Sequence, residues 1–179
     1  MRPGLRVALL VAVGLSVFGQ LSGVNIVFYY GPTILKATNL PLQDAFQWQV
    51  ALGIVNFVFT VIAIFAVDSW GRRPLLIWGM AAVTLLLAAT AAMIWAGGSA
   101  LWIVLLLCLY VASVALSICA VIWIITAEIF PNRIRGRAMS VATFANWGTN
   151  LIAAFLFPWF VDKYGLHVGF FTFAGICLV

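Results

Sequence analysis

The feature that most constrains this chain is a series of apolar runs, each separated from the next by a short polar or charged connector. A helix needs about 20 residues to cross the hydrocarbon core of a bilayer. We expect crossings over 5–35, 48–67, 75–96, 100–127, 138–161 and 168–179. Because 66% of the residues are hydrophobic and only 7% are charged, lipid must solvate much of the surface. The sequence predicts an all-α polytopic membrane protein.

The first and last runs do not have the length of one straight crossing. The run from Leu5 to Leu35 is too long, which predicts a bend near Gly23 or Gly31-Pro32. Residues 168–179 rise about 18 Å as a helix, against a core of about 30 Å. We therefore expect the last helix to be incomplete and the chain to be a fragment. Six crossings in two groups of three also predict an inverted three-plus-three repeat, from hydropathy and position alone.

Basic residues lie mainly on one side of the predicted membrane. Alternate connectors place two lysines, Lys36 and Lys163, on one side and seven arginines on the other: Arg2, Arg6, Arg72, Arg73, Arg133, Arg135 and Arg137. The positive-inside rule then places the N-terminus in the cytoplasm. We expect an integral protein of the cell membrane. This topology and anionic lipid headgroups explain the net charge of +5 without a nucleic-acid partner.

Polar side chains recur at mid-depth in four of the runs. In the first run Ser22, Asn25 and Tyr29 share one helical stripe, and Gln20 lies about 140° from Asn25 on an ideal helix. The other runs contribute Gln49, Gly53, Asn56 and Thr60; Ser113, Ser117 and Trp123; and Asn146, Trp147 and Asn150. Amides donate and accept hydrogen bonds, and an indole adds an apolar face and one donor. This set suits a neutral polyhydroxylated ligand such as a sugar.

The same amides have a structural alternative. Side-chain hydrogen bonds between membrane helices stabilise their packing by about 0.6–2 kcal/mol, which explains any single Asn or Ser equally well. An enzyme is not expected, because no nucleophile–base or metal constellation is present. Cys108, Cys119 and Cys177 lie in apolar runs without disulfide or metal spacing. We therefore predict no cofactor and no metal.

Four segments resemble motifs of the sugar porter family in the major facilitator superfamily. Gln20–Tyr30 is similar to the seventh-helix signature, and Asp68–Arg73 to the loop motif after the eighth helix. Trp123–Arg137 resembles the segment after the tenth helix, and Asn146-Trp147 with Asn150 the eleventh-helix motif. These matches cover essentially the whole chain, in the family's order and spacing.

The resemblance implies the C-terminal six-helix half of a twelve-helix carrier, a sugar uniporter or sugar:proton symporter that works by alternating access. It implies a monosaccharide site near the membrane centre and an outer gate of Tyr29 and Tyr30. The implied sugar contacts are Gln20, Asn25, Asn56, Trp123, Asn146 and Trp147. The implied partners are the sugar, the bilayer, the N-terminal half of the carrier and, for a symporter, protons.

The connector charges also resemble a family feature. Arg72, Arg73, Glu128 and Arg135 are similar to the salt-bridge network that locks the outward-open state. The positive-inside rule alone accounts for the three arginines. It does not account for Glu128, which stands at the end of an apolar run.

Two departures from the family pattern carry expectations. Gly19 stands where the family often has the first of two glutamines, so one sugar contact is missing. Cys119-Ala120 replaces the usual Gly-Pro break, which predicts a straighter fourth crossing. The alternative function is a non-transporting sugar-binding or sensor module, or a nonfunctional truncated product. We expect this chain alone not to transport, because it supplies only half of a central site.

Overall fold

The computed structural model describes residues 3–36 and 42–178, and the elements in these ranges are helices. In chain order they are α1 Pro3–Gln20, α2 Val24–Lys36, α3 Leu42–Trp70, α4 Arg72–Trp95, α5 Ala100–Val114, the π-helical turn η1 Ala115–Cys119, α6 Ala120–Ile129, α7 Asn132–Tyr164 and α8 Leu166–Cys177. Arg2 and Val179, which entered the sequence predictions, lie outside the described residues.

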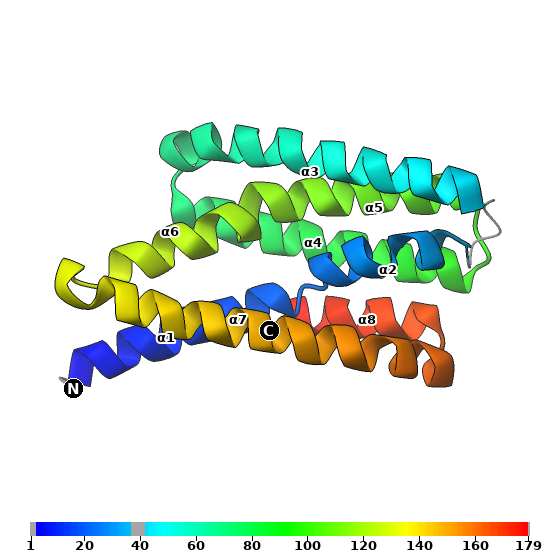
Figure 1. The fold of residues 1–179 in the computed structure, drawn as a ribbon. Coiled ribbons are helices and arrows are strands. Elements are labelled where there is room, and N and C mark those ends of the chain that lie inside the picture. The colour runs from blue at the N-terminus through cyan, green and yellow to red at the C-terminus, as the bar shows by residue number, and fades with distance from the viewer. Residues whose placement is uncertain (1–2, 37–41, 179) are drawn as a thin grey trace.

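The helices form a bundle with all long axes roughly aligned (Figure 1). Helix α1 lies beside α7, and α4 packs against both α5 and α8. Within the part of the chain that the structure describes, four stretches are long and apolar enough to cross a membrane: Leu5–Lys36, Asp44–Trp70, Arg72–Trp95 and Ala100–Ile129. Helix α8 is apolar but shorter. The all-α membrane class is confirmed, whereas the inverted repeat stays a prediction.

Several helices extend beyond the expected crossings into the connectors. Helix α3 begins at Leu42, and it reaches Trp70 before α4 starts at Arg72, so the expected charged turn contains only Gly71. Helix α7 likewise begins at Asn132 and includes most of the arginine segment. A helix satisfies its own backbone hydrogen bonds, so it can continue to the depth where charged side chains reach the headgroups and water.

The first run is broken at Gly23, one of the two predicted places. Helix α1 ends at Gln20, and α2 begins at Val24 after a short turn in which the Gly23 N–H donates to the Gln20 carbonyl at 3.2 Å. Gly23 has a φ of 85°, a left-handed conformation that other residues adopt only at a cost. Pro32 lies inside α2 and does not end it. The change of direction is therefore at Gly23, not at Gly31-Pro32.

The expectation of a straighter fourth crossing is wrong. A π-helical turn, η1, interrupts it at Ala115–Cys119, and α6 leaves the direction of α5 (Figure 1). A π-turn inserts one residue into the helical ladder, so it bends the helix without a proline. Gly79 of α4 packs closely on this turn, since a Cβ there would overlap the Ser117 side chain.

Buried side chains and exposed ones both indicate a lipid-solvated bundle. The main core centres on α5, where Tyr110 and Leu107 are fully buried against residues of α2, α3, α4 and α8. A small-residue cluster that includes Ala12 and Ala142 joins α1 to α7, which lets the two backbones approach. On the outside Phe144 and Phe155 are each 82% exposed. Large apolar side chains at that exposure require lipid or another protein surface to cover them.

Candidate functional site

Two asparagines of α7 hold the broken helix from one side. The Nδ2 group of Asn146 donates to the Ser16 carbonyl in α1 at 3.0 Å, and this contact is buried. One turn further along, Asn150 Nδ2 donates to the phenolic oxygen of Tyr29 in α2 at 3.0 Å. The two hydrogen bonds lie on opposite sides of the break at Gly23. Asn146 thus follows the helix-bridging alternative with one of its two N–H donors.

The second predicted gate residue, Tyr30, also contacts α7. Its hydroxyl donates to the Ala154 carbonyl at 2.9 Å, and its ring centroid lies 5.4 Å from that of Phe157. Tyr30 is half-buried, whereas Tyr29 is 52% exposed. Both tyrosines of α2 therefore form hydrogen bonds with α7. Their role as an outer gate stays a prediction.

Gln20 and Asn25 lie at the two ends of the break. Gln20 is the last residue of α1 and is buried, and Asn25 is in the first turn of α2 and half-buried. The turn at Gly23 separates them, so the 140° offset of an ideal continuous helix does not apply. This removes the geometric objection to both amides serving one ligand.

The other predicted sugar contacts come from three different helices. Asn56 in α3 is half-buried, Trp123 in α6 is 36% exposed and Trp147 in α7 is 56% exposed. Within residues 3–36 and 42–178 no hydrogen bond joins them to Gln20 or Asn25. The two indoles are thus accessible at the bundle surface rather than enclosed in the core.

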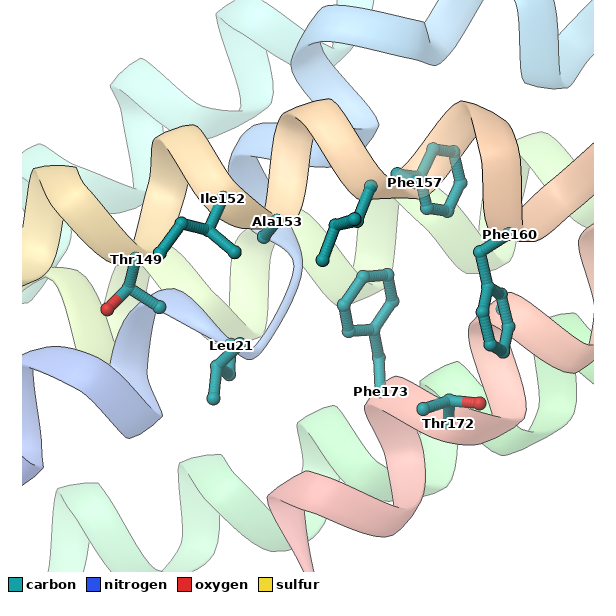
Figure 2. A pocket seen from close by; sticks show the side chains of 10 residues that line it. Leu21, Thr149, Ile152, Ala153, Phe157, Phe160, Thr172 and Phe173 are labelled. Atoms are coloured by element: carbon teal, nitrogen blue, oxygen red, sulfur yellow. The ribbon is translucent and has the colours of Figure 1, made fainter.

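A cavity of about 240 Å³ lies between α7 and α8 (Figure 2). Phe157 and Phe160 of α7 face Phe173 of α8 across it, and the Phe157 and Phe173 rings stack with centroids 6.0 Å apart. Its remaining lining residues are Leu21, Thr149, Ile152, Ala153, Leu156, Gly169 and Thr172. None of the predicted sugar contacts lines this cavity.

The chemistry of this cavity does not suit a sugar. Its two hydroxyls are already engaged within their own helices, where Thr149 donates to the Ala145 carbonyl and Thr172 to the Val168 carbonyl, each at 2.8 Å. The other lining side chains are apolar or aromatic. A sugar buried there would lose hydrogen bonds to water without replacement. The amide-bearing residues around the break remain the better candidates.

Of the four predicted network charges, the structure pairs two. Arg72 at the start of α4 and Glu128 near the end of α6 form a salt bridge at 2.6 Å, with both side chains about half exposed. Arg73 is exposed, and the Nε atom of Arg135 is buried without a partner in the described chain. Among the described residues no group of three or more His, Cys, Asp or Glu could hold a metal ion.

The missing glutamine at position 19 has a packing reason. A Cβ on Gly19 would overlap the end of the Ile122 side chain of α6, so a larger residue fits here only if that side chain moves. Glycine at this position lets α1 and α6 approach closely. The departure from the family pattern thus coincides with a helix–helix contact.

Two contacts to the broken helix were not predicted: Gln49 was placed only in a polar stripe of its run, and Tyr110 was given no role. Gln49 Nε2 of α3 donates to the Phe28 carbonyl at 2.7 Å, and the Tyr110 hydroxyl of α5 donates to the Ser22 carbonyl at 2.7 Å. A tyrosine inside an apolar run signals a need for a hydrogen-bond partner. The sequence does not say which carbonyl is that partner.

Comparison with known proteins decides the family. The family model described as "Sugar (and other) transporter" matches residues 1–179. The chain belongs to this family. The sugar porter resemblance is thereby confirmed, and members of this family are transporters rather than enzymes.

Individual relatives agree with this membership. The chain is 36% identical over 177 residues to the arabinose-proton symporter of Bacillus subtilis, covering 98% of this chain and 38% of the relative. It is 34% identical over 145 residues to the glucose facilitated diffusion protein of Zymomonas mobilis, covering 81% of this chain and 31% of the relative. The chain therefore spans between about a third and two-fifths of the length of these relatives.

A solved structure shows the same fold. The proton:xylose symporter XylE of the major facilitator superfamily, bound to 6-bromo-6-deoxy-D-glucose, superposes with a TM-score of 0.86 at 30% identity. The superposition covers 95% of this chain and 37% of the symporter chain. The helices of this chain thus form part of a major facilitator fold.

Proposed function

We propose that this chain is the C-terminal half of a membrane carrier that transports a monosaccharide by alternating access. The observation that carries the proposal is the break at Gly23, with Gln20 and Asn25 at its two ends. A discontinuous membrane helix with polar side chains at its break is a recurrent way to build a solute site in transporters. Family membership and the sugar-transporting relatives support it.

The proposed ligand contacts match the chemistry of a sugar. Gln20, Asn25, Asn56 and Asn146 each offer an amide donor and acceptor for hydroxyl groups, and none of them buries a charge. Trp123 and Trp147 present apolar ring faces at the accessible surface of α6 and α7. An N-terminal half that packs on this surface would complete the site. Alone, the chain offers one wall and does not transport.

The Arg72–Glu128 salt bridge supports a second proposal, that charged pairs lock the cytoplasmic side of the carrier. It joins α4 to α6 at the end of the bundle that the positive-inside rule places in the cytoplasm. We propose that this pair forms in the outward-open state and breaks when the cytoplasmic side opens, with Arg73 and Arg135 as further members of the network. The N-terminus is then cytoplasmic, and the carrier lies in the cell membrane.

The energy source is open to a direct test. The relatives include a proton symporter and a facilitated diffusion protein, so both proton:sugar symport and uniport are candidates. The experiment is uptake of a panel of labelled pentoses and hexoses into proteoliposomes that hold the intact protein containing this chain. Accumulation that depends on an imposed proton gradient identifies a symporter, whereas equilibration without it identifies a uniporter.

Matched variants tie uptake to the proposed site. Asn25→Ala and Trp123→Phe should lower sugar affinity. The controls are Asn132→Ala and Trp95→Phe, which change the same residue types at exposed positions away from the break. Absence of uptake for every sugar, with binding retained, would favour the non-transporting sensor instead.

A further inference from the structure

Two prolines lie inside helices next to the candidate site. Pro32 is in α2 and Pro158 is in α7, and neither ends its helix. Proline has no backbone N–H, so the carbonyl four residues earlier loses its helical hydrogen bond. Those carbonyls belong to Phe28 and Ala154. In a bilayer an unpaired carbonyl is costly, because no water replaces the lost donor.

Each of the two carbonyls accepts a hydrogen bond from a side chain of the neighbouring helix. Gln49 Nε2 in α3 donates to the Phe28 carbonyl at 2.7 Å. The Tyr30 hydroxyl in α2 donates to the Ala154 carbonyl at 2.9 Å. Gly31 leaves the space that the Gln49 side chain needs for its bond to the Phe28 carbonyl, since a Cβ at position 31 would overlap the Gln49 amide. The same arrangement thus occurs twice, linking α3 to α2 and α2 to α7.

We propose that Gln49 and Tyr30 are positioning residues that cap the carbonyls freed by Pro32 and Pro158 and so hold α2 between α3 and α7. The break at Gly23 leaves the orientation of α2 only weakly fixed by α1. The two caps help to fix it, together with the Asn150–Tyr29 hydrogen bond, and with it Asn25 in the first turn of α2. This deepens the proposed function and rests on it only where sugar affinity is the readout.

The caps also give α2 a defined way to move. A helix carbonyl paired within its own backbone cannot change partner without unwinding the helix. A carbonyl paired with a side chain exchanges that partner for water once the helices separate. Movement of α2 away from α3 or from α7 therefore breaks the one cap that joins it to that helix and leaves both helices intact. The packed arrangement is favoured until water or ligand compensates.

Double-mutant cycles on the intact protein test the cap in α7, with hydrogen exchange of α2 and α7 amides as the readout. Tyr30→Phe keeps the ring contact with Phe157 and removes only the donor. It should speed exchange about fivefold. In a Pro158→Ala background the new N–H pairs with the Ala154 carbonyl, so Tyr30→Phe should then change little. Tyr29→Phe is the matched control, because its hydroxyl accepts from Asn150 and its effect should be equal in both backgrounds.

The cap in α2 is tested in the same way. Gln49→Leu should speed exchange of α2 with Pro32 present and have little effect with Pro32→Ala. Gly31→Ala provides a second variant, since it displaces Gln49 without removing the amide. It should reproduce the effect of Gln49→Leu and add nothing to it. Equal effects of Tyr30→Phe or Gln49→Leu in the proline and alanine backgrounds would overturn the assignment.

Sugar affinity tests the positioning claim separately. Tyr30→Phe and Gln49→Leu should each raise KM for uptake about threefold with little change in maximal rate, because loss of one modest hydrogen bond loosens Asn25. Coupled exchange with an unchanged KM would overturn the positioning claim and leave the caps as packing contacts. If the intact protein takes up no sugar, the proposed function fails, while the exchange cycles still decide whether the caps exist.

Discussion

The hydroxyl of Tyr110 in α5 donates a hydrogen bond to the backbone carbonyl of Ser22, 2.7 Å away, inside the break between α1 and α2. Tyr110 is fully buried, and Ser22 belongs to neither helix. The central helix of the bundle therefore supports the irregular backbone directly. Non-helical backbone is tolerated at membrane depth only where the surrounding protein or a water-filled cavity satisfies it.

Removing this hydroxyl should destabilise the break. Tyr110→Phe leaves a buried carbonyl without its donor, and we expect it to lower the free energy of unfolding by about 1–3 kcal/mol. Thermal unfolding in detergent measures this. Tyr164→Phe is the control, because Tyr164 is exposed at the end of α7 and should change stability little. Equal stability of the two variants would contradict the support role.

Gly23 should not tolerate a side chain. Its φ of 85° costs another residue about 1–2 kcal/mol, and a Cβ would lie 3.0 Å from the Phe173 ring. We expect Gly23→Ala to lower thermal stability and sugar affinity together. Gly148→Ala in α7 is the matched control, since a Cβ there meets nothing within 4 Å and alanine favours the helix. A stable Gly23→Ala protein would show that the break does not need the left-handed conformation.

Asn146 should have two separable effects. Asn146→Ala removes the bond to the Ser16 carbonyl and should lower stability by about 1 kcal/mol, the range of interhelical hydrogen bonds in membranes. It should also lower sugar affinity if the proposed site is right. Asn56→Ala should lower affinity alone, because the Asn56 side chain has no hydrogen-bond partner in the described part of the chain. Thermal unfolding and sugar binding on both variants measure the difference.

The Arg72–Glu128 pair should affect transport more than stability. Both side chains are about half exposed, so the pair contributes at most about 1 kcal/mol to folding. We expect Glu128→Lys to alter uptake kinetics strongly, and the double variant Arg72→Glu with Glu128→Arg to recover part of the loss. Asp162→Lys is the control, because Asp162 is an exposed acid near the C-terminal end of α7 and is not part of this pair. Unchanged uptake kinetics in Glu128→Lys would contradict the proposed lock.

The sequence predicted the features that depend on local chemistry. Apolar length predicted membrane helices, and the overlong first run predicted a bend, with Gly23 as one of its two candidate places. The fourth crossing was predicted wrongly from the missing proline, because the π-turn at Ala115–Cys119 bends it by another mechanism. Proline is one cause of a kink and not the only one, and the choice among them depends on packing against α4.

The candidate site was also predicted in part by the sequence and completed by the structure. Four motifs identified the family and three of the predicted amides, Gln20, Asn25 and Asn146, since residue type and spacing carry that information. Only the tertiary structure showed that Asn146 donates a hydrogen bond to the Ser16 carbonyl and that Arg72, rather than Arg73, pairs with Glu128. Side chains of different helices choose among many partners, and distance along the chain does not rank them.

By itself, the sequence determined that this protein crosses a membrane, that its first apolar run bends near Gly23 or Gly31-Pro32, and that Pro32 and Pro158 lack N–H groups. These follow from solvent preference and from backbone chemistry that each residue carries wherever it lies. The tertiary structure alone decided that Gln49 and Tyr30 pair with the two freed carbonyls. The demand for a hydrogen bond is local, but its donor comes from another helix, and only packing brings that donor within reach.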